Sequence, residues 1–146
     1  MNNTHTFHTH IVENQPEIIA PYNLWSCDIM LTDAVRHYAN DDIIARAGNK
    51  LAAFGHEAGF LLMDAGELAN RHKPIFQPFD RYGRRIDNVE FHPAYHQLMR
   101  AAMNAEVHSY SWRNEQHSGA HVVRAALLFM HAQADAGTTC PLTMTH

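Results

Sequence analysis

Apolar residues recur every three or four positions along much of the chain, the spacing that collects them on one face of an α-helix. A first stretch follows Asp28, a side chain suited to capping a helix N-terminus, and covers residues 29–38. Residues 41–54 and 57–69 repeat the pattern, which predicts three consecutive amphipathic helices. On the third, the apolar face would consist of Phe60, Leu61, Leu62, Ala65 and Leu68.

The pattern changes between residues 73 and 93. Pro74 and Pro78 exclude a helix interior, because proline lacks the amide hydrogen and clashes with the preceding turn. Two short stretches with apolar residues, one on either side of Gly83, predict a β-hairpin near residues 76–91, with its turn near that glycine. Pro93, at a first helical position, would open a fourth helix. Its apolar face would consist of Tyr95, Leu98, Met99, Ala102 and Met103.

The longest apolar stretch covers residues 119–136 and is apolar nearly all round, which predicts the buried central helix of the domain. Gly137 is expected to end this helix, and Cys140–Pro141 to open a further one just before the sequence stops at His146. A natural domain seldom ends on the first turn of an apolar helix. We therefore expect the chain to be a fragment of a longer protein.

These elements predict an all-α fold of about five helices with one short β-hairpin. Residues 24–146 would form the helical domain. Residues 1–23 are polar and broken by Pro16 and Pro21, so we expect an extended N-terminal arm that wraps the domain or a neighbouring subunit.

Composition and charge narrow the class of protein. A length of 146 residues with 46% hydrophobic residues fits one globular domain. The net charge of −4 disfavours nucleic acid or an anionic membrane as a partner of this segment. Two distant cysteines, the absence of a signal peptide and the absence of an apolar run long enough to span a bilayer favour a cytoplasmic location.

Thirteen histidines raise the question of a metal site. His92/His96 and His117/His121 have the i,i+4 spacing that zinc proteases use. No glutamate follows the first histidine of either pair, Pro93 places His92 outside the next helix, and zinc needs at least three well-placed ligands. We therefore expect no metal and assign the histidines to helix caps, the surface or interfaces, with a histidine-rich metal binder as a further hypothesis.

Motifs for catalysis are absent from the sequence, so we expect no catalytic or cofactor-binding residue in this chain. There is no GxSxG, and the glycines Gly55, Gly59 and Gly66 fall inside predicted helices rather than in a phosphate-binding loop. The charged segment 80–93 is explained by exposed Arg–Asp pairs, each contributing about 0–1 kcal/mol. A subunit or domain contact is the alternative interpretation of that segment.

Several motifs occur in a characteristic order. They are Asn14-Gln15-Pro16, the run D-x-x-G-R-R-x-D-x-V-x-F-H-P-A over residues 80–94, Ser118-Gly119-Ala120, and the closing Cys140-Pro141-Leu142-Thr143-Met144-Thr145. This set resembles the N-terminal domain of the AidB-type (adaptive-response) acyl-CoA dehydrogenases. The resemblance covers essentially the whole chain from about residue 14, and the hairpin and the closing segment are its most specific parts.

The resemblance implies the first, helical domain of a larger flavoprotein. In the family a β-barrel-like middle domain and a C-terminal helical domain follow, hold FAD and carry the catalytic glutamate and the DNA-binding surface, and the assembled enzyme is usually a tetramer. FAD is therefore expected in the full-length family and not on this fragment. The other two domains of the same protein are the expected partners, together with further copies of the chain in a homo-oligomer.

The same resemblance gives this domain a role in the active site. It would contribute subunit contacts and one wall of the active-site cavity of an FAD-dependent oxidoreductase acting on CH–CH donors, within a family associated with alkylation damage. By position, the wall candidates are Gln133, Thr139, Cys140 and Thr143. The alternative is a stand-alone helical protein-interaction module without enzymatic activity.

Overall fold

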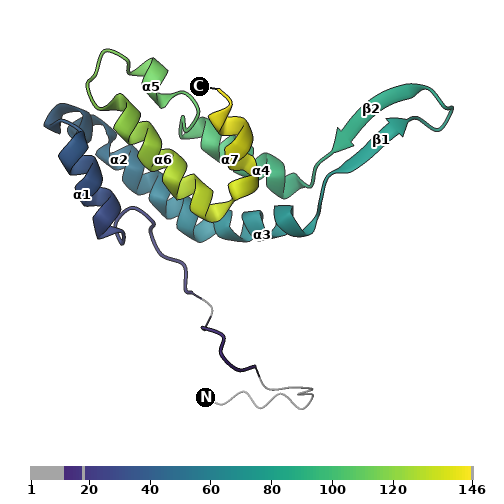
Figure 1. Cartoon of the computed structure of the whole chain (residues 1–146), viewed down its shortest axis with the longest axis horizontal. Coiled ribbons are helices and arrows are strands. Elements are labelled where there is room, and N and C mark those ends of the chain that lie inside the picture. The colour runs from purple at the N-terminus through teal and green to yellow at the C-terminus, as the bar shows by residue number, and fades with distance from the viewer. Residues whose placement is uncertain (1–11, 18, 146) are drawn as a thin grey trace.

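The structure is a computed structural model that describes residues 12–17 and 19–145 (Figure 1). Its elements are α1 (Ile29–Tyr38), α2 (Asp41–Glu57), the π-helical segment η1 (Ala58–Leu62), α3 (Met63–Arg71), β1 (Ile75–Phe79), β2 (Arg85–Glu90), α4 (Pro93–Asn104), α5 (Tyr110–Arg113), α6 (Ala120–Ala134) and α7 (Ala136–Thr143). The predicted fold class, helical with one short hairpin, is confirmed. No helix in the described ranges is long and apolar enough to cross a membrane.

Side-chain caps fix where three of the helices begin. Asp28 accepts a hydrogen bond from the Leu31 amide at 2.8 Å, as predicted, and Asn40 accepts one from the Ile43 amide at 2.9 Å. These oxygens satisfy amide groups that have no partner within the first helical turn. His92 takes the same role for α4 through its Nδ1 atom. The described part of the expected arm, residues 12–17 and 19–23, contains no helix or strand, and its residues 12–17 extend away from the helices (Figure 1).

The predicted break between the second and third helices is wrong, because α2, η1 and α3 follow one another without interruption. The glycines in this region serve close packing instead. A Cβ atom on Gly59 would lie 1.8 Å from the Tyr22 carbonyl oxygen, and one on Gly55 would lie 2.6 Å from the Trp25 nitrogen. The Leu24 amide donates to the Gly55 carbonyl at 3.0 Å. Segment 22–25 therefore lies directly on the helix.

The π-helical segment also explains why the predicted buried face of the third helix is partly wrong. Leu62 and Ala65 are buried, but Phe60, Leu61 and Leu68 are exposed. A π-helical turn contains more residues than an α-helical turn, so a strict 3.6-residue period assigns the wrong side chains to the core beyond it. Met103 of α4 is likewise exposed, whereas Leu98 and Ala102 are buried as predicted.

Helix α6 is the central helix, as predicted: it contacts α1, α2, η1, α3, α5 and α7. Val123, Leu127 and Met130 are fully buried on it. The predicted end of this helix is wrong, because it ends at Ala134 and not at Gly137. Asp135 closes α6 and caps α7, so Gly137 and Pro141 lie inside α7, which starts four residues earlier than predicted.

The hairpin projects from the helical body (Figure 1). Strands β1 and β2 are antiparallel and pair Ile75 with Glu90, Phe76 with Val89, Gln77 with Asn88 and Phe79 with Arg85, with an irregularity between Gln77 and Phe79. Gly83 has φ +78°, the left-handed conformation that favours glycine in a turn. The Asp80 carboxylate accepts hydrogen bonds from two amides of the turn. The predicted hairpin and its turn position are confirmed.

Candidate functional site

The corner between α6 and α7 is built around Asp135. This carboxylate is buried and accepts hydrogen bonds from the amide and the hydroxyl of Thr138, both at 2.6 Å. Asn70 of α3 donates to it through Nδ2 at 3.2 Å and to the Gly66 carbonyl at 3.0 Å. A buried carboxylate needs such donors because it has lost water. The contacts tie α3 to the start of α7.

His131 completes the polar cluster from within α6. Its Nε2 atom lies 2.9 Å from the Thr138 hydroxyl oxygen, and its ring stacks on Phe54 with the centroids 6.3 Å apart. The Thr138 hydroxyl donates to Asp135, so it accepts from His131, and the proton of the neutral imidazole is on Nε2. Burial lowers the pKa of His131 and outweighs the charge of Asp135, which acts to raise it. The ring is therefore neutral.

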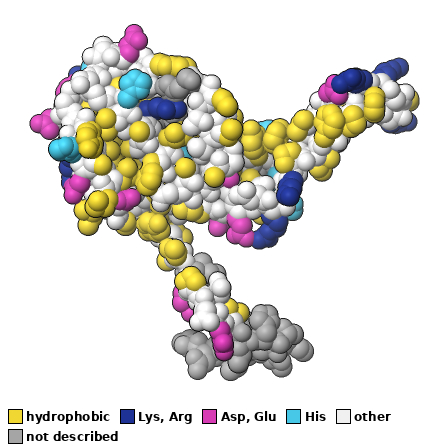
Figure 2. All heavy atoms as spheres, viewed as in Figure 1, with side chains coloured by type: hydrophobic (Ala, Val, Ile, Leu, Met, Phe, Trp, Pro, Cys, Tyr) yellow, Lys and Arg dark blue, Asp and Glu magenta, His cyan; other side chains and the backbone are white. Residues whose placement is uncertain are grey.

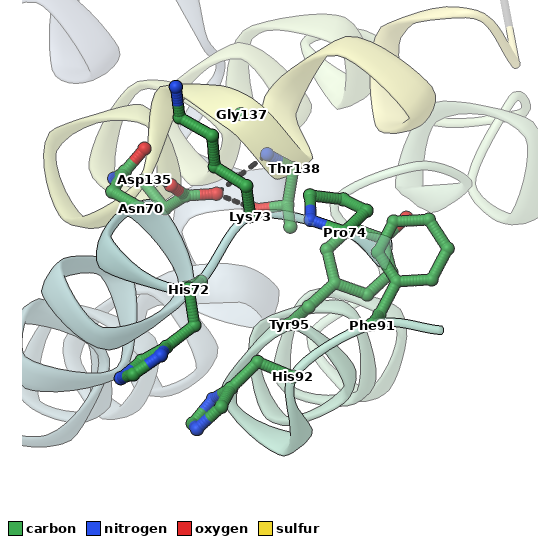
Figure 3. A pocket seen from close by; sticks show the side chains of 11 residues that line it. Asn70, His72, Lys73, Pro74, Phe91, His92, Tyr95, Asp135, Gly137 and Thr138 are labelled. Atoms are coloured by element: carbon green, nitrogen blue, oxygen red, sulfur yellow. Dashed lines mark hydrogen bonds between the residues drawn. The ribbon is translucent and has the colours of Figure 1, made fainter. Parts of the chain in front are cut away.

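A cavity of about 320 Å³ opens beside this cluster (Figure 3). It lies where the end of α3 and the starts of α4 and α7 meet the neck of the hairpin, which comprises residues 72–74 and 91–92. Phe91 and Tyr95 stack with their centroids 4.2 Å apart on one side of the cavity, next to Pro74. Asp135 and Asn70 lie on the other side (Figure 3). The cavity can accept an apolar group with a polar end.

Two stacked histidines border the cavity at the neck of the hairpin (Figure 3). The His72 and His92 rings are 4.7 Å apart and nearly parallel, with 13° between their planes. His72 precedes β1 and His92 follows β2, so the stack holds together the two chain segments that enter and leave the hairpin. His92 Nδ1 also accepts the Ala94 amide at 3.2 Å. The cavity wall on this side is thus joined to the cap of α4.

The histidine pairs found in the sequence lie in different surroundings. His92 and His117 both lie outside the helices that follow them, as predicted, and His117 Nδ1 is 3.5 Å from an Asp42 oxygen. His96 is exposed on α4. No group of three or more histidine, cysteine or acidic side chains suited to a metal ion occurs within residues 12–17 and 19–145.

None of the four predicted wall residues lines the 320 Å³ cavity. Gln133 borders a separate hollow formed with residues 22–30. Thr139, Cys140 and Thr143 are together on α7, where Cys140 and Thr143 are exposed. The hydroxyl of Thr139 donates to the Asp135 carbonyl at 2.9 Å and that of Thr143 to the Cys140 carbonyl at 2.8 Å. The structure therefore groups three of the four candidates.

Sequence reasoning missed the polar cluster itself. Two signals pointed to it: a histidine, His131, in the second half of the most apolar helix, and the spacing Asp135-x-x-Thr138, which is typical of a helix N-cap. Asn70 gave no signal, because only the tertiary fold brings it to Asp135.

Comparisons with known proteins agree with this architecture. The family model of the adaptive response protein AidB N-terminal domain matches residues 14–146. The Escherichia coli (strain K12) protein named "Putative acyl-CoA dehydrogenase AidB" is 39% identical over 140 residues, which are 94% of this chain and 25% of that protein.

Two solved structures share the fold at low sequence identity. The structure named "Bd2924 apo-form" has a TM-score of 0.76 at 20% identity and covers 87% of this chain and 25% of its own. Caenorhabditis elegans ACDH-11 in complex with C11-CoA has a TM-score of 0.76 at 19% identity and covers 92% of this chain and 23% of its own. The chain thus spans about a quarter of the length of the relatives it matches.

The structure and its solved neighbours together define a type of helical domain whose fold also occurs in Bd2924 and in Caenorhabditis elegans ACDH-11. Within that type, the chain belongs to the family of adaptive response protein AidB N-terminal domains. The resemblance seen in the hairpin motif and the closing Cys-Pro segment is confirmed.

Proposed function

We propose that the chain is the N-terminal domain of an FAD-dependent, AidB-type oxidoreductase acting on CH–CH donors, in which it supplies one wall of the active-site cavity and subunit contacts. The 39% identity to the Escherichia coli relative over 94% of this chain carries the proposal. FAD and the catalytic residues would belong to the other domains, and the assembly would be a cytoplasmic homo-oligomer, a tetramer as in the family.

Rigid support of α7 favours its role as a wall. Side chains that line an active site need a second layer of contacts that fixes their positions. Here the buried Asp135, Thr138 and His131 hold the first turn of α7 through hydrogen bonds of 2.6–2.9 Å. We assign the wall to the exposed side of this helix, with Thr139, Cys140 and Thr143, and to Gln133 at the end of α6.

An apolar groove between α1 and α6 supports docking of further domains. It measures about 240 Å³ and presents almost only carbon atoms, with Tyr38 and Phe129 strongly exposed at its sides. Exposed apolar surface of this kind marks an interface. Because the relatives are about four times longer than this chain, we propose that their additional domains cover the groove.

A chimera tests the proposed function. Residues 14–146 would replace the matching first quarter of the Escherichia coli AidB protein, and bound flavin would be measured by absorbance after gel filtration. We expect the chimera to retain FAD in the proportion found for the unaltered protein. A folded, helical chimera without flavin would contradict the proposal and favour the stand-alone interaction module, whose support is the exposed apolar groove.

The wall assignment has its own test within that chimera. C11-CoA, the ligand bound in the Caenorhabditis elegans ACDH-11 structure, would be titrated while the flavin spectrum is recorded. Cys140→Trp should weaken the spectral response, because the larger side chain would fill the cavity from the exposed side of α7. Gln116→Trp, at an exposed position between α5 and α6, is the control and should leave the titration unchanged. Equal effects of both variants would remove α7 from the wall.

A further inference from the structure

The cavity between α3, α4 and α7 contains a buried carboxylate with no cation beside it. Asp135 is 4% exposed and lines the cavity. Among residues 12–17 and 19–145, no Lys, Arg or His nitrogen lies within ion-pair distance of this carboxylate. A cation stabilises a charge that has been removed from water, so a cationic ligand would gain binding energy from contact with Asp135.

One of the two Asp135 oxygens has room for a further hydrogen-bond donor. Oδ2 accepts both short hydrogen bonds from Thr138, each at 2.6 Å. Within the described residues, Oδ1 accepts only one, from Asn70 Nδ2 at 3.2 Å. A carboxylate oxygen can accept two hydrogen bonds, so Oδ1 can accept one more.

Gly137 leaves this carboxylate accessible from the cavity. It lines the cavity, and a Cβ atom built on it would lie 3.5 Å from both Asp135 oxygens, which is ordinary van der Waals contact. Alanine would therefore fit at position 137. A larger side chain would extend beside the carboxylate and occupy the space in front of it, so the small residue at this position gives a ligand access to Asp135.

The opposite side of the cavity is apolar. The rings of Phe91 and Tyr95 stack there beside Pro74, across the cavity from Asp135 (Figure 3). A dry cavity of about 150 Å³ holds a benzene molecule, so a volume of about 320 Å³ admits an aromatic ring with a short chain. A ligand of this shape would place its ring against the stacked aromatic side chains and its polar end at the carboxylate.

Three other residues of the cavity wall can carry a positive charge: Lys73, His72 and His92. Lys73 is exposed, and its amino end points away from the stacked aromatic rings (Figure 3). The two histidine rings lie against each other at the neck of the hairpin, apart from Asp135 (Figure 3). Water and salt screen an exposed charge more than a buried one. The buried carboxylate therefore dominates, and the cavity favours a cation over an anion.

We propose that this cavity binds a small organic cation of the arylalkylammonium class, whose ammonium group donates to Asp135 Oδ1 and whose ring packs against Phe91 and Tyr95. A hydrogen bond between an ammonium group and a carboxylate is stronger than one between neutral groups. The cavity should consequently prefer an amine over an alcohol of the same shape. The site is separate from the wall assigned to the exposed side of α7, so the proposal does not rest on the proposed function.

Isothermal titration calorimetry of the 146-residue chain with three ligands of similar shape tests the proposal. Phenethylammonium should bind at least about tenfold more tightly than the neutral phenethyl alcohol and the anionic hydrocinnamate. The titrations would be made at about pH 8, where histidine side chains are largely uncharged. No binding of phenethylammonium at millimolar concentration, or equal affinities for the amine and the alcohol, would overturn the proposal. Tighter binding of hydrocinnamate would overturn it too and assign the cavity to an anion.

Substitutions at Gly137 test where the ligand binds. Gly137→Leu should weaken phenethylammonium binding at least about tenfold, because its side chain would fill the space in front of Asp135. Gly137→Ala is the matched control and should change the affinity less than about twofold. Circular dichroism would verify that both variants keep the helical fold. Unchanged binding by a folded Gly137→Leu variant would exclude this cavity as the site.

Asp135→Asn tests the charge itself. The amide oxygen can still accept from Thr138 and cap α7, whereas the negative charge is lost. Phenethylammonium should bind at least about tenfold more weakly to this variant, and its affinity should approach that of phenethyl alcohol. A variant that is folded and retains the full preference for the amine would contradict the role of Asp135.

Discussion

The helical body and the hairpin of this domain are stabilised in different ways. In the body, Leu98, Val123, Leu127 and Met130 are completely buried, and Asp135 and Thr138 at the α6–α7 corner form hydrogen bonds with each other. In the hairpin, every residue from 81 to 90 is exposed. The shape of the hairpin therefore comes from local turn and pairing rules, whereas the shape of the body comes from packing.

This difference separates two roles. Packing gives the body one fixed arrangement, which is what a cavity wall requires. The hairpin buries few of its own residues, since Phe76, Ile86 and Val89 are all exposed. Substitutions in the two regions should consequently differ: those in the body lower the free energy of unfolding, and those on the hairpin leave it nearly unchanged.

The largest difference is expected between Leu127→Ala and Phe79→Ala. Leu127 is fully buried on α6, and removing its methyl groups leaves a cavity, so the free energy of unfolding should fall by about 3 kcal/mol. Phe79 is exposed at the end of strand β1, and its truncation should cost less than about 0.5 kcal/mol. Urea unfolding followed by circular dichroism measures both. Similar losses would mean that the hairpin belongs to the packed core.

Two separate glycine substitutions test close packing inside the body. A Cβ atom on Gly66 would lie 2.1 Å from the Ala134 carbonyl oxygen, so Gly66→Ala should destabilise the domain by about 2 kcal/mol or more as α3 is pushed from the end of α6. Gly48 of α2 has nothing within 4 Å of that position. Gly48→Ala should therefore stabilise the domain by about 0.5–1 kcal/mol through helix propensity. Thermal unfolding of both variants gives the comparison, and a stabilising Gly66→Ala would contradict the contact.

The buried His131 predicts a pH dependence of the body. Burial lowers the pKa of His131 from its ordinary value of 6.5, so below that pH the unfolded chain binds a proton that the folded domain does not. Stability should be complete above pH 6.5 and should fall as the pH falls, by at most about 1.4 kcal/mol per pH unit for this one group, until the folded-state pKa is passed.

His131→Gln isolates this effect from the other histidines. Glutamine can still donate to Thr138 but does not titrate, so the difference in unfolding free energy between wild type and variant should shrink as the pH is lowered. His37→Gln, at an exposed position on α1, is the control, and its unfolding free energy should depend on pH as that of the wild type does. A parallel pair of profiles for wild type and His131→Gln would show that the imidazole titrates normally.

Local rules made the hairpin the best-predicted region. Pro74 and Pro78 excluded a helix, and Gly83 marked the turn, because each acts through its own backbone. The Asp28 cap was predictable for the same reason. Periodicity located α6 as the central helix but placed its end three residues too late, since the Asp135 cap that ends it competes with a continuous apolar pattern.

The site was less predictable because it depends on tertiary contacts. The helical break expected near Phe54 is absent: segment 22–25 packs on Gly55 and Gly59, and the sequence alone shows the glycines but not their neighbour. Asp135 and Asn70 meet across 65 positions. A pattern confined to one helix reports the position of a cap, but not which distant amide completes the cluster.

Arg124 is a charged residue of the body with buried atoms that lack a partner among the described residues, as do the Nδ1 atoms of His108 and His131. It lies on α6 at helical spacing from the buried Ala120, Leu127 and His131, and its Nε and Nη2 atoms are buried without a hydrogen-bond acceptor in the part of the chain that the structure describes. Burial lowers the pKa of Arg124, because a charge that has partly lost water is disfavoured.

Arg124→Met keeps most of the aliphatic volume and removes that charge, so it should raise the free energy of unfolding by about 1 kcal/mol. Arg100→Met, at an exposed position on α4, should change it by less than about 0.5 kcal/mol. Differential scanning calorimetry of the two variants compares them directly. A clear loss of stability in Arg124→Met would mean that the guanidinium is paired in solution, and that its charge stabilises the helical body.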